Sequence, residues 1–161
     1  MGRVKTGVRE RLLFQLAKIL RRIKMNSKKP ILLAEDDRVD VMTVQRALKE
    51  LKVTNRLNVV ANGDEALKFL RDPKNERPCV ILLDLNMPQM NGIDFLKVAK
   101  ADEKLRIIPV VVLTTSKEEK DKIQSFNLGV AGYMLKPVDY SQFVEVIRAI
   151  DLYWTLSELP E

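Results

Sequence analysis

The stretch CVILLDLNMPQMNG, residues 79–92, decides the fold class of this chain. It opens with an unbroken apolar run, Val80 to Leu83, which is typical of a strand buried on both faces of a parallel sheet. The run stops at Asp84, and the proline, asparagine and glycine that follow turn the chain. Asp84 is therefore expected at the carboxyl end of a strand, where open α/β sheets have their ligand crevice. It is either a solvated strand end or the reactive group of a site.

Strand-like and helix-like segments alternate along the rest of the chain. Apolar runs predict four more strands, and periodic apolar residues between and after the strands predict five helices. The expected strands cover residues 31–34, 57–61, 79–83, 107–115 and 131–136, and the expected helices cover 38–51, 62–70, 93–100, 117–126 and 140–154. Asn62 or Gly63 is expected to cap the second helix, and Gly129 to end the fourth. Short connections and right-handed crossovers then favour an α/β fold, a doubly wound five-stranded parallel sheet with helices on both faces.

The composition excludes several kinds of site. With 161 residues the chain is long enough for one ordinary domain. It has no histidine, which excludes Ser-His-Asp and Cys-His catalysis, the common zinc sites and a phosphohistidine carried by this chain. Its one cysteine, Cys79, is expected in the core, and a single cysteine fits a reducing, cytoplasmic location. No apolar run approaches the ~18 residues that a transmembrane helix needs, and no signal peptide is evident.

The net charge of +6 belongs to the N-terminal arm. Residues 1–25 contain eight basic residues and one acidic residue, so the remainder is close to neutral and no nucleic-acid partner is expected for it. The pattern over residues 8–24 predicts a basic amphipathic helix. Four interpretations of this helix stay open: an upstream translation artefact before a true start at Met25, packing on a partner or a second copy, membrane contact, or nucleic-acid contact.

Polar side chains follow four of the five predicted strands. Because the carboxyl ends of parallel strands meet at one edge of a sheet, these side chains are expected to converge on one crevice. They are Glu35, Asp36 and Asp37 after the first strand, Asp84 after the third, Thr114, Thr115 and Ser116 around the end of the fourth, and Lys136 at the end of the fifth.

This combination of groups suits phosphoryl transfer. Clustered carboxylates favour a hard divalent cation, and Mg²⁺ usually takes one or two carboxylates together with a phosphate oxygen. Asp84 could then attack phosphorus as a nucleophile, while Lys136 and the Thr114 hydroxyl bind phosphoryl oxygens. A carboxylate nucleophile needs no general base, which is consistent with the absence of histidine.

Four motifs, taken in order, resemble the receiver domains of response regulators in two-component signalling. The motifs are LLAEDD (32–37), LLDLNMPQMNG (82–92), VVVLTTS (110–116) and YMLKP (133–137). The resemblance covers about residues 28–150 and implies a flavodoxin-like fold. It divides the chain into an arm at 1–27, a receiver domain at 28–155 and a C-terminal tail at 156–161.

The resemblance implies a role for each acidic residue of the crevice. Asp84 corresponds to the phospho-acceptor, Asp36 to a direct metal ligand and Glu35 to its outer acidic partner, with Mg²⁺ as the cofactor. The backbone carbonyl of Asn86 would be the third protein ligand of the metal. Asp37 is left to cap the following helix.

Three further residues would respond to the phosphoryl group. Lys136 corresponds to the lysine that pairs with phosphate, and Thr114 to the switch hydroxyl. Tyr133 corresponds to the aromatic residue that turns inward once Thr114 is recruited. The resemblance also implies a cis peptide bond between Lys136 and Pro137.

A protein of this kind accepts a phosphoryl group from a separate histidine kinase. With no effector domain after residue 150, we expect it to signal through protein–protein contacts, or to act as a phosphotransfer shuttle or phosphate sink. The VVVLTTS motif and the aromatic pair Tyr153 and Trp154 are similar to a stand-alone subgroup that partners phytochrome-type histidine kinases. That subgroup tends to form homodimers, so self-association is a further expectation.

Two other functional classes compete with this interpretation. A phosphatase that forms an aspartyl-phosphate, like the haloacid-dehalogenase enzymes, places a second aspartate two positions after the nucleophile. Here that position is Asn86, which cannot transfer a proton, so we do not expect an enzyme. A binding module with an inactive site is the other class, and the complete set of strand-end residues argues against it.

Overall fold

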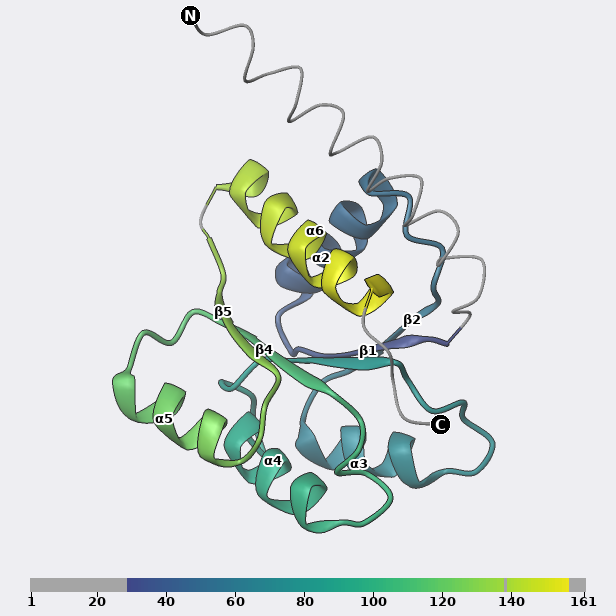
Figure 1. Cartoon of the computed structure of the whole chain (residues 1–161), viewed down its shortest axis with the longest axis vertical. Coiled ribbons are helices and arrows are strands. Elements are labelled where there is room, and N and C mark those ends of the chain that lie inside the picture. Colours follow the sequence, from purple (N-terminus) through teal and green to yellow (C-terminus); the bar gives the residue numbers. More distant parts are fainter. Residues whose placement is uncertain (1–28, 138, 157–161) are drawn as a thin grey trace, which may run out of the picture.

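The computed structural model describes residues 29–137 and 139–156 (Figure 1). Within this part of the chain, five parallel strands form one sheet in the order β2-β1-β3-β4-β5. The strands are β1 (Ile31–Ala34), β2 (Leu57–Val60), β3 (Val80–Leu83), β4 (Val110–Thr114) and β5 (Gly132–Leu135). The helices are α2 (Arg38–Glu50), α3 (Gly63–Arg71), α4 (Gly92–Ala101), α5 (Glu119–Asn127) and α6 (Tyr140–Leu156). The predicted doubly wound parallel sheet is confirmed, while the predicted helix over 8–24 lies outside the described residues.

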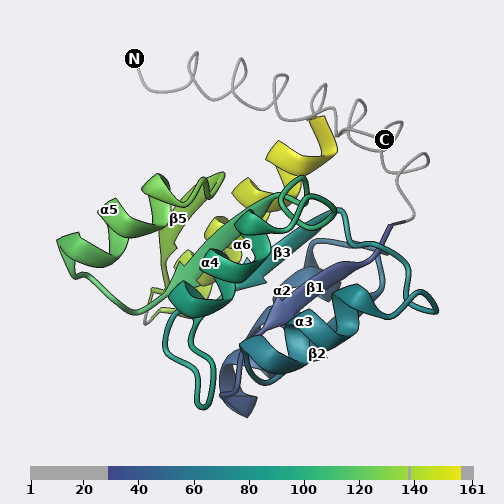
Figure 2. The same cartoon turned by 90° about the horizontal axis from the view of Figure 1, so that it is seen from below.

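The helices cover the two faces of the sheet in two groups. Helices α2 and α6 pack together on one face, and α3, α4 and α5 lie on the other (Figures 1 and 2). In the parts of the chain at 29–137 and 139–156, no helix is long and apolar enough to cross a membrane.

Alternate residues of the central strands belong to two separate apolar clusters, one on each face of the sheet. In β3, Ile81 and Leu83 pack with Phe95 and Leu96 of α4, whereas Val80 and Leu82 join the cluster of α2 and α6. Strands β1, β3 and β4 are buried along their whole length, because helices cover both of their faces. This burial explains why the sequence of each strand is a continuous apolar run. Burial also fixes the register of the strands, and the register brings their carboxyl ends together.

Side-chain caps start three of the helices next to the carboxyl edge of the sheet. Asp37 accepts hydrogen bonds from the backbone N–H groups of Val39 and Asp40, and so caps α2 as predicted. Asn62 caps α3 and Asn91 caps α4 in the same way. At the other end of α5, Gly129 adopts a φ of 85°, a left-handed conformation that suits glycine after a helix.

The predicted element boundaries differ from the observed ones by a few residues. Strand β4 begins at Val110 rather than at Ile107, because Pro109 has no N–H to donate to a ladder. Strand β3 begins one residue after Cys79, and α5 begins at Glu119 rather than at Lys117. Helix α6 continues to Leu156, two residues beyond the prediction.

Candidate functional site

The ladder of the sheet holds the predicted site residues at neighbouring strand ends. The N–H of Asp84 donates to the carbonyl of Ala34 at 3.0 Å, and the N–H of Lys136 donates to the carbonyl of Thr114 at 2.8 Å. The N–H of Glu35 likewise donates to Val60 at 2.9 Å. Pairing therefore continues one residue beyond β1, β3 and β5, and it fixes the backbone of Glu35, Asp84 and Lys136.

Three carboxylates form an acidic cluster, made of Glu35, Asp36 and Asp84. One oxygen of each lies within 4.8 Å of one oxygen of the other two. Glu35 and Asp84 are buried, at 3% and 6% exposure, and Asp36 is exposed to solvent. Buried like charges at this separation favour either a bound proton or a bound cation, so the donor set suits a hard divalent metal ion.

The electrostatics of Glu35 reflect this crowding. Burial raises the pKa of the Glu35 carboxyl to about 7, and the nearby charge of Asp84 adds to the increase. The hydrogen bond from Lys136 opposes both effects without cancelling them. A cation placed among these oxygens would favour the ionised form of Glu35 for the same reason that Lys136 does.

Lys136 is the positive centre of the site. Its Nζ donates hydrogen bonds to Glu35 and, at 2.8 Å, to Asp40, and lies 3.5 Å from Oδ2 of Asp84. Its side chain is only 6% exposed. Burial alone would lower the pKa of the Lys136 amine, but the hydrogen bonds to Asp40 and Glu35 and the charge of Asp84 raise it above its ordinary value. Lys136 is therefore a fixed cation beside Asp84.

Asp40 was not among the residues that the sequence pattern indicated. It lies in the first turn of α2, three residues after the Asp37 cap, and accepts a hydrogen bond from Lys136. An acidic residue in a first helical turn is common, because it complements the helix dipole. Only the position of α2 relative to β5 reveals the contact with lysine, so no signal in the sequence alone would have separated Asp40 from an ordinary first-turn acid.

Thr114 and Tyr133 are connected through the loop after β4. Thr114 is fully buried, and its Oγ1 accepts a hydrogen bond from the N–H of Ser116 at 3.3 Å. The hydroxyl of Tyr133 donates to the carbonyl of Ser116 at 2.9 Å, and the Ser116 hydroxyl donates to Asp121 at 2.6 Å. Both predicted switch residues thus form hydrogen bonds to Ser116, in the loop of residues 115–118 between β4 and α5.

Asn86 and Gly92 shape the loop that follows Asp84. The N–H of Asn86 donates to Oδ1 of Asp84 at 3.3 Å, which orients the carboxylate. A β-carbon at Gly92 would lie 2.5 Å from the carbonyl oxygen of Asp84, so only glycine lets α4 begin this close to the site. The sequence indicated a turn at Gly92 but not this close approach.

One geometric prediction is wrong. Every peptide bond among the described residues is trans, including the bond between Lys136 and Pro137. The trans form is favoured by about 0.5–1 kcal/mol even before proline, and the amine of Lys136 reaches its three acidic partners from this backbone.

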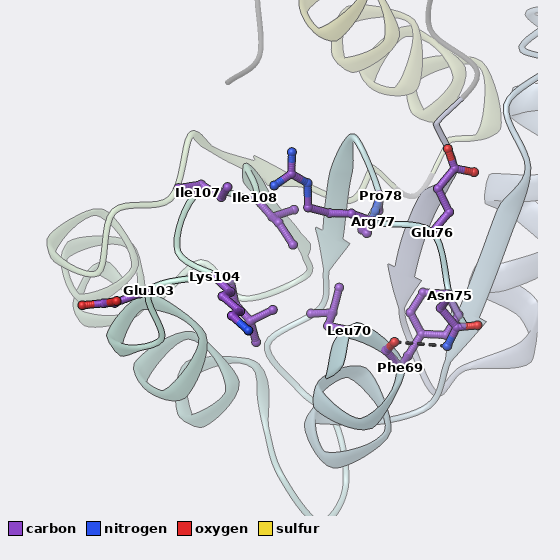
Figure 3. Close-up of a pocket in the computed structure, with 11 residues that line it drawn as sticks. Phe69, Leu70, Asn75, Glu76, Arg77, Pro78, Glu103, Lys104, Ile107 and Ile108 are labelled. Atoms are coloured by element: carbon purple, nitrogen blue, oxygen red, sulfur yellow. Dashed lines mark hydrogen bonds between the residues drawn. The ribbon is translucent and has the colours of Figure 1, made fainter. Parts of the chain in front are cut away.

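A separate hollow of about 410 Å³ lies at the opposite edge of the sheet (Figure 3). It is lined by the end of α3 and by the loops that lead into β3 and β4, with Phe69, Leu70 and Ile108 among its apolar residues. Asn75 donates a hydrogen bond to the carbonyl of Phe69 within it, at 3.1 Å. None of the predicted site residues lines this hollow.

Comparison with known proteins identifies the family of the chain. The chain matches the response regulator receiver domain over residues 31–148. It is 37% identical over 133 residues to the response regulator Rcp1 of Synechocystis sp., which covers 80% of this chain and 90% of Rcp1.

Two solved structures are similar over nearly their whole length. The phosphorylated cyanobacterial phytochrome response regulator RcpA is 37% identical, with a TM-score of 0.78, and the match covers 84% of this chain and 100% of that one. The Mn²⁺-bound form of response regulator Rcp1 is 36% identical, with a TM-score of 0.77, over 83% of this chain and 99% of that one. The chain therefore belongs to the response regulator receiver domain family.

Proposed function

We propose that Asp84 of this response regulator accepts a phosphoryl group from a histidine kinase, with Mg²⁺ as the cofactor. The observation that carries the proposal is the position of the Lys136 amine, 3.5 Å from Oδ2 of Asp84, next to the acidic cluster. Phosphoryl transfer needs a cation and metal-binding oxygens close to the accepting carboxylate, because its catalysis consists mainly of positioning and charge neutralisation.

The acidic cluster fits a hard divalent cation. Its donors are all carboxylate oxygens, and Mg²⁺ and Mn²⁺ share this preference. In support, the similar protein Rcp1 has been solved in a Mn²⁺-bound form. We propose that Asp36 and Asp84 ligate Mg²⁺ directly, that Glu35 supports it from the outer side, and that the carbonyl of Asn86 completes the protein ligands. The metal would neutralise charge on the incoming phosphoryl group.

The residues of the chain would carry out the transfer as follows. A carboxylate oxygen of Asp84 attacks phosphorus, the bond between phosphorus and the histidine nitrogen of the kinase breaks, and an acyl phosphate forms on Asp84. The Lys136 amine binds a phosphoryl oxygen, which it can reach with little movement from its present place beside Asp84. The departing histidine nitrogen keeps the electron pair of the broken bond, and a proton on the other ring nitrogen makes the leaving imidazole neutral.

Thr114 and Tyr133 would respond to the new phosphoryl group by changing the conformation of the protein surface. We propose that the Thr114 hydroxyl moves to a phosphoryl oxygen and draws the loop at Ser116 with it. The hydroxyl of Tyr133 donates to the Ser116 carbonyl and so holds the ring against that loop. A shift of the loop would break this hydrogen bond, and the Tyr133 ring could then turn inward. Phosphorylation then biases a two-state element made of the loop and β5.

The partner we propose is a histidine kinase of the phytochrome type. The support is the similarity to RcpA, which is a cyanobacterial phytochrome response regulator. A homodimer that signals through protein–protein contacts is part of the same proposal, as is a cytoplasmic location, where a kinase domain and Mg²⁺ would be available. Receiver-domain response regulators are generally signalling proteins, and Asn86 at the position of a second acid argues against turnover as the purpose.

The proposal can be tested with the purified chain, Mg²⁺ and acetyl phosphate. Intact mass spectrometry should show one added phosphate on the wild-type chain and none on Asp84→Asn or in excess chelator. An unmodified wild-type chain would contradict the proposal. Continuous hydrolysis of a generic phosphate ester would favour the phosphatase, and rapid onward transfer to a histidine phosphotransfer protein would favour the shuttle.

A further inference from the structure

Lys136 has an acidic partner that the proposed phosphoryl transfer does not use. Oδ2 of Asp40 accepts a hydrogen bond from its Nζ at 2.8 Å, which is shorter than the 3.5 Å from Nζ to Asp84. Asp40 lies on α2 and is not part of the acidic cluster of Glu35, Asp36 and Asp84. Its carboxylate therefore binds the lysine from outside the metal-binding set.

The ammonium group of lysine has three N–H donors arranged as a tripod. Glu35 and Asp40 accept two of them, and these are the hydrogen bonds that the Lys136 side chain makes among the described residues. The third N–H can therefore point toward Asp84, whose Oδ2 lies 3.5 Å from Nζ. Two charge-assisted hydrogen bonds fix the direction of the third donor, which the flexible lysine chain could not fix by itself.

Asp40 and Glu35 are themselves held by one short segment. The N–H of Asp40 donates to Oδ1 of the Asp37 cap at 3.2 Å, and the N–H of Asp37 donates to Oε1 of Glu35 at 3.1 Å. Both acceptors of Lys136 therefore belong to the junction between β1 and α2, which the Asp37 cap stabilises. This junction therefore holds at two points an amine that comes from the end of β5, an edge strand of the sheet.

We propose that Asp40 is a positioning residue that, together with Glu35, directs the third N–H of Lys136 toward the phosphoryl group on Asp84. The inference rests on the proposed function and extends it to a residue outside the motifs. Two effects of removing Asp40 have opposite signs. Loss of the hydrogen bond would slow transfer, whereas loss of a negative charge would help an anionic phosphodonor to approach. The side chain of Asp40 is 34% exposed, so solvent screens its charge more than its directional hydrogen bond, and slowing should dominate.

The test compares rates of phosphorylation by acetyl phosphate with Mg²⁺. Asp40→Ala removes the acceptor and should slow the reaction about tenfold, the size expected for a hydrogen bond to a charged group. Asp40→Asn keeps an acceptor oxygen and should lose less. Asp94→Ala is the matched control, because Asp94 is exposed, occupies the same third position of α4, and its N–H donates to the Asn91 cap at 2.9 Å. It should react like the wild type.

The same substitution made in a Lys136→Ala variant shows whether Asp40 acts through the lysine. In Lys136→Ala, adding Asp40→Ala should cause no further loss, which a general structural role of Asp40 would not predict. Asp40 variants as fast as the wild type or faster would overturn the inference, as would an equal loss in both backgrounds. If Asp40→Ala does not fold, the Asp40→Asn rate decides by the same criterion. A wild-type chain that is not phosphorylated would overturn the proposed function, and this inference with it.

Discussion

Gly92 stands so close to Asp84 that a β-carbon at Gly92 would lie 2.5 Å from the Asp84 carbonyl oxygen and 2.8 Å from Cα of Leu85. Both neighbours are backbone atoms, which cannot turn away as a flexible side chain can. The N–H of Gly92 also donates to the carbonyl of Leu85 at 3.0 Å, so α4 begins directly against the loop that carries the proposed phospho-acceptor. The absence of a side chain at Gly92 therefore allows α4 to pack directly against the backbone of Asp84.

Gly92→Ala should consequently damage both stability and phosphorylation. Relief of the clash needs a shift of backbone, and overpacking of this kind costs about 1–3 kcal/mol. Gly132→Ala is the control, because its β-carbon would meet only Val111 side-chain atoms, at 3.8 Å or more. Urea denaturation should show a clear loss for Gly92→Ala and little change for Gly132→Ala. Equal stability of the two variants would contradict the close approach.

Asp36→Asn should weaken Mg²⁺ binding by about tenfold or more, because one of the few direct carboxylate ligands becomes a neutral amide. The neighbouring Asp37→Asn is the control, since asparagine caps a helix about as well as aspartate and Asp37 is not in the acidic cluster. Mg²⁺ should raise the unfolding temperature of the wild type and of Asp37→Asn. If both variants lost Mg²⁺ stabilisation to the same extent, the assignment of Asp36 would be wrong.

Tyr133→Phe should loosen the loop after β4 without abolishing phosphorylation. The variant loses the hydrogen bond to the Ser116 carbonyl, which is worth about 1 kcal/mol. Amide hydrogen exchange around residues 115–118 should become faster. Tyr140→Phe loses a comparable hydrogen bond, to Glu50 at 2.8 Å, and should leave exchange in that loop unchanged. Identical exchange in both variants would show that Tyr133 does not hold the loop.

Cys79 should make the fold sensitive to alkaline pH. Burial raises the pKa of its thiol to about 11, above the ordinary value of 9.0. The unfolded chain then loses this proton at a lower pH than the folded chain, so stability falls as pH rises from about 9 to 11, by up to about 2–3 kcal/mol, and is unaffected below that window. Cys79→Ala should show a shallower fall in urea denaturation over the same range. Equal slopes would indicate an ordinary, solvated thiol.

The sequence predicted the framework of the fold because the sheet leaves a strong signature. Strands covered on both faces must be apolar throughout, so runs such as Val80 to Leu83 identify them directly. The polar residues that end these runs must then lie at one edge of a parallel sheet. The pattern of residues alone therefore indicates that Glu35, Asp84 and Lys136 belong to one site.

What the sequence could not predict depends on how separate elements meet. The contact between Asp40 and Lys136 requires the position of α2 relative to β5, and the role of Gly92 requires the distance from α4 to the backbone of Asp84. Neither distance leaves a periodic signal. The expected cis bond before Pro137 was wrong, since it came from resemblance rather than from any local constraint.

The most direct test of the account is to locate the phosphoryl group itself. After reaction with acetyl phosphate and Mg²⁺, borohydride reduction converts an acyl phosphate of aspartate into homoserine, which peptide mass spectrometry can place. The account predicts homoserine at Asp84 and at no other acidic residue. Homoserine at Asp36, Asp37 or Asp40 instead, or at no residue of a properly folded chain, would contradict it.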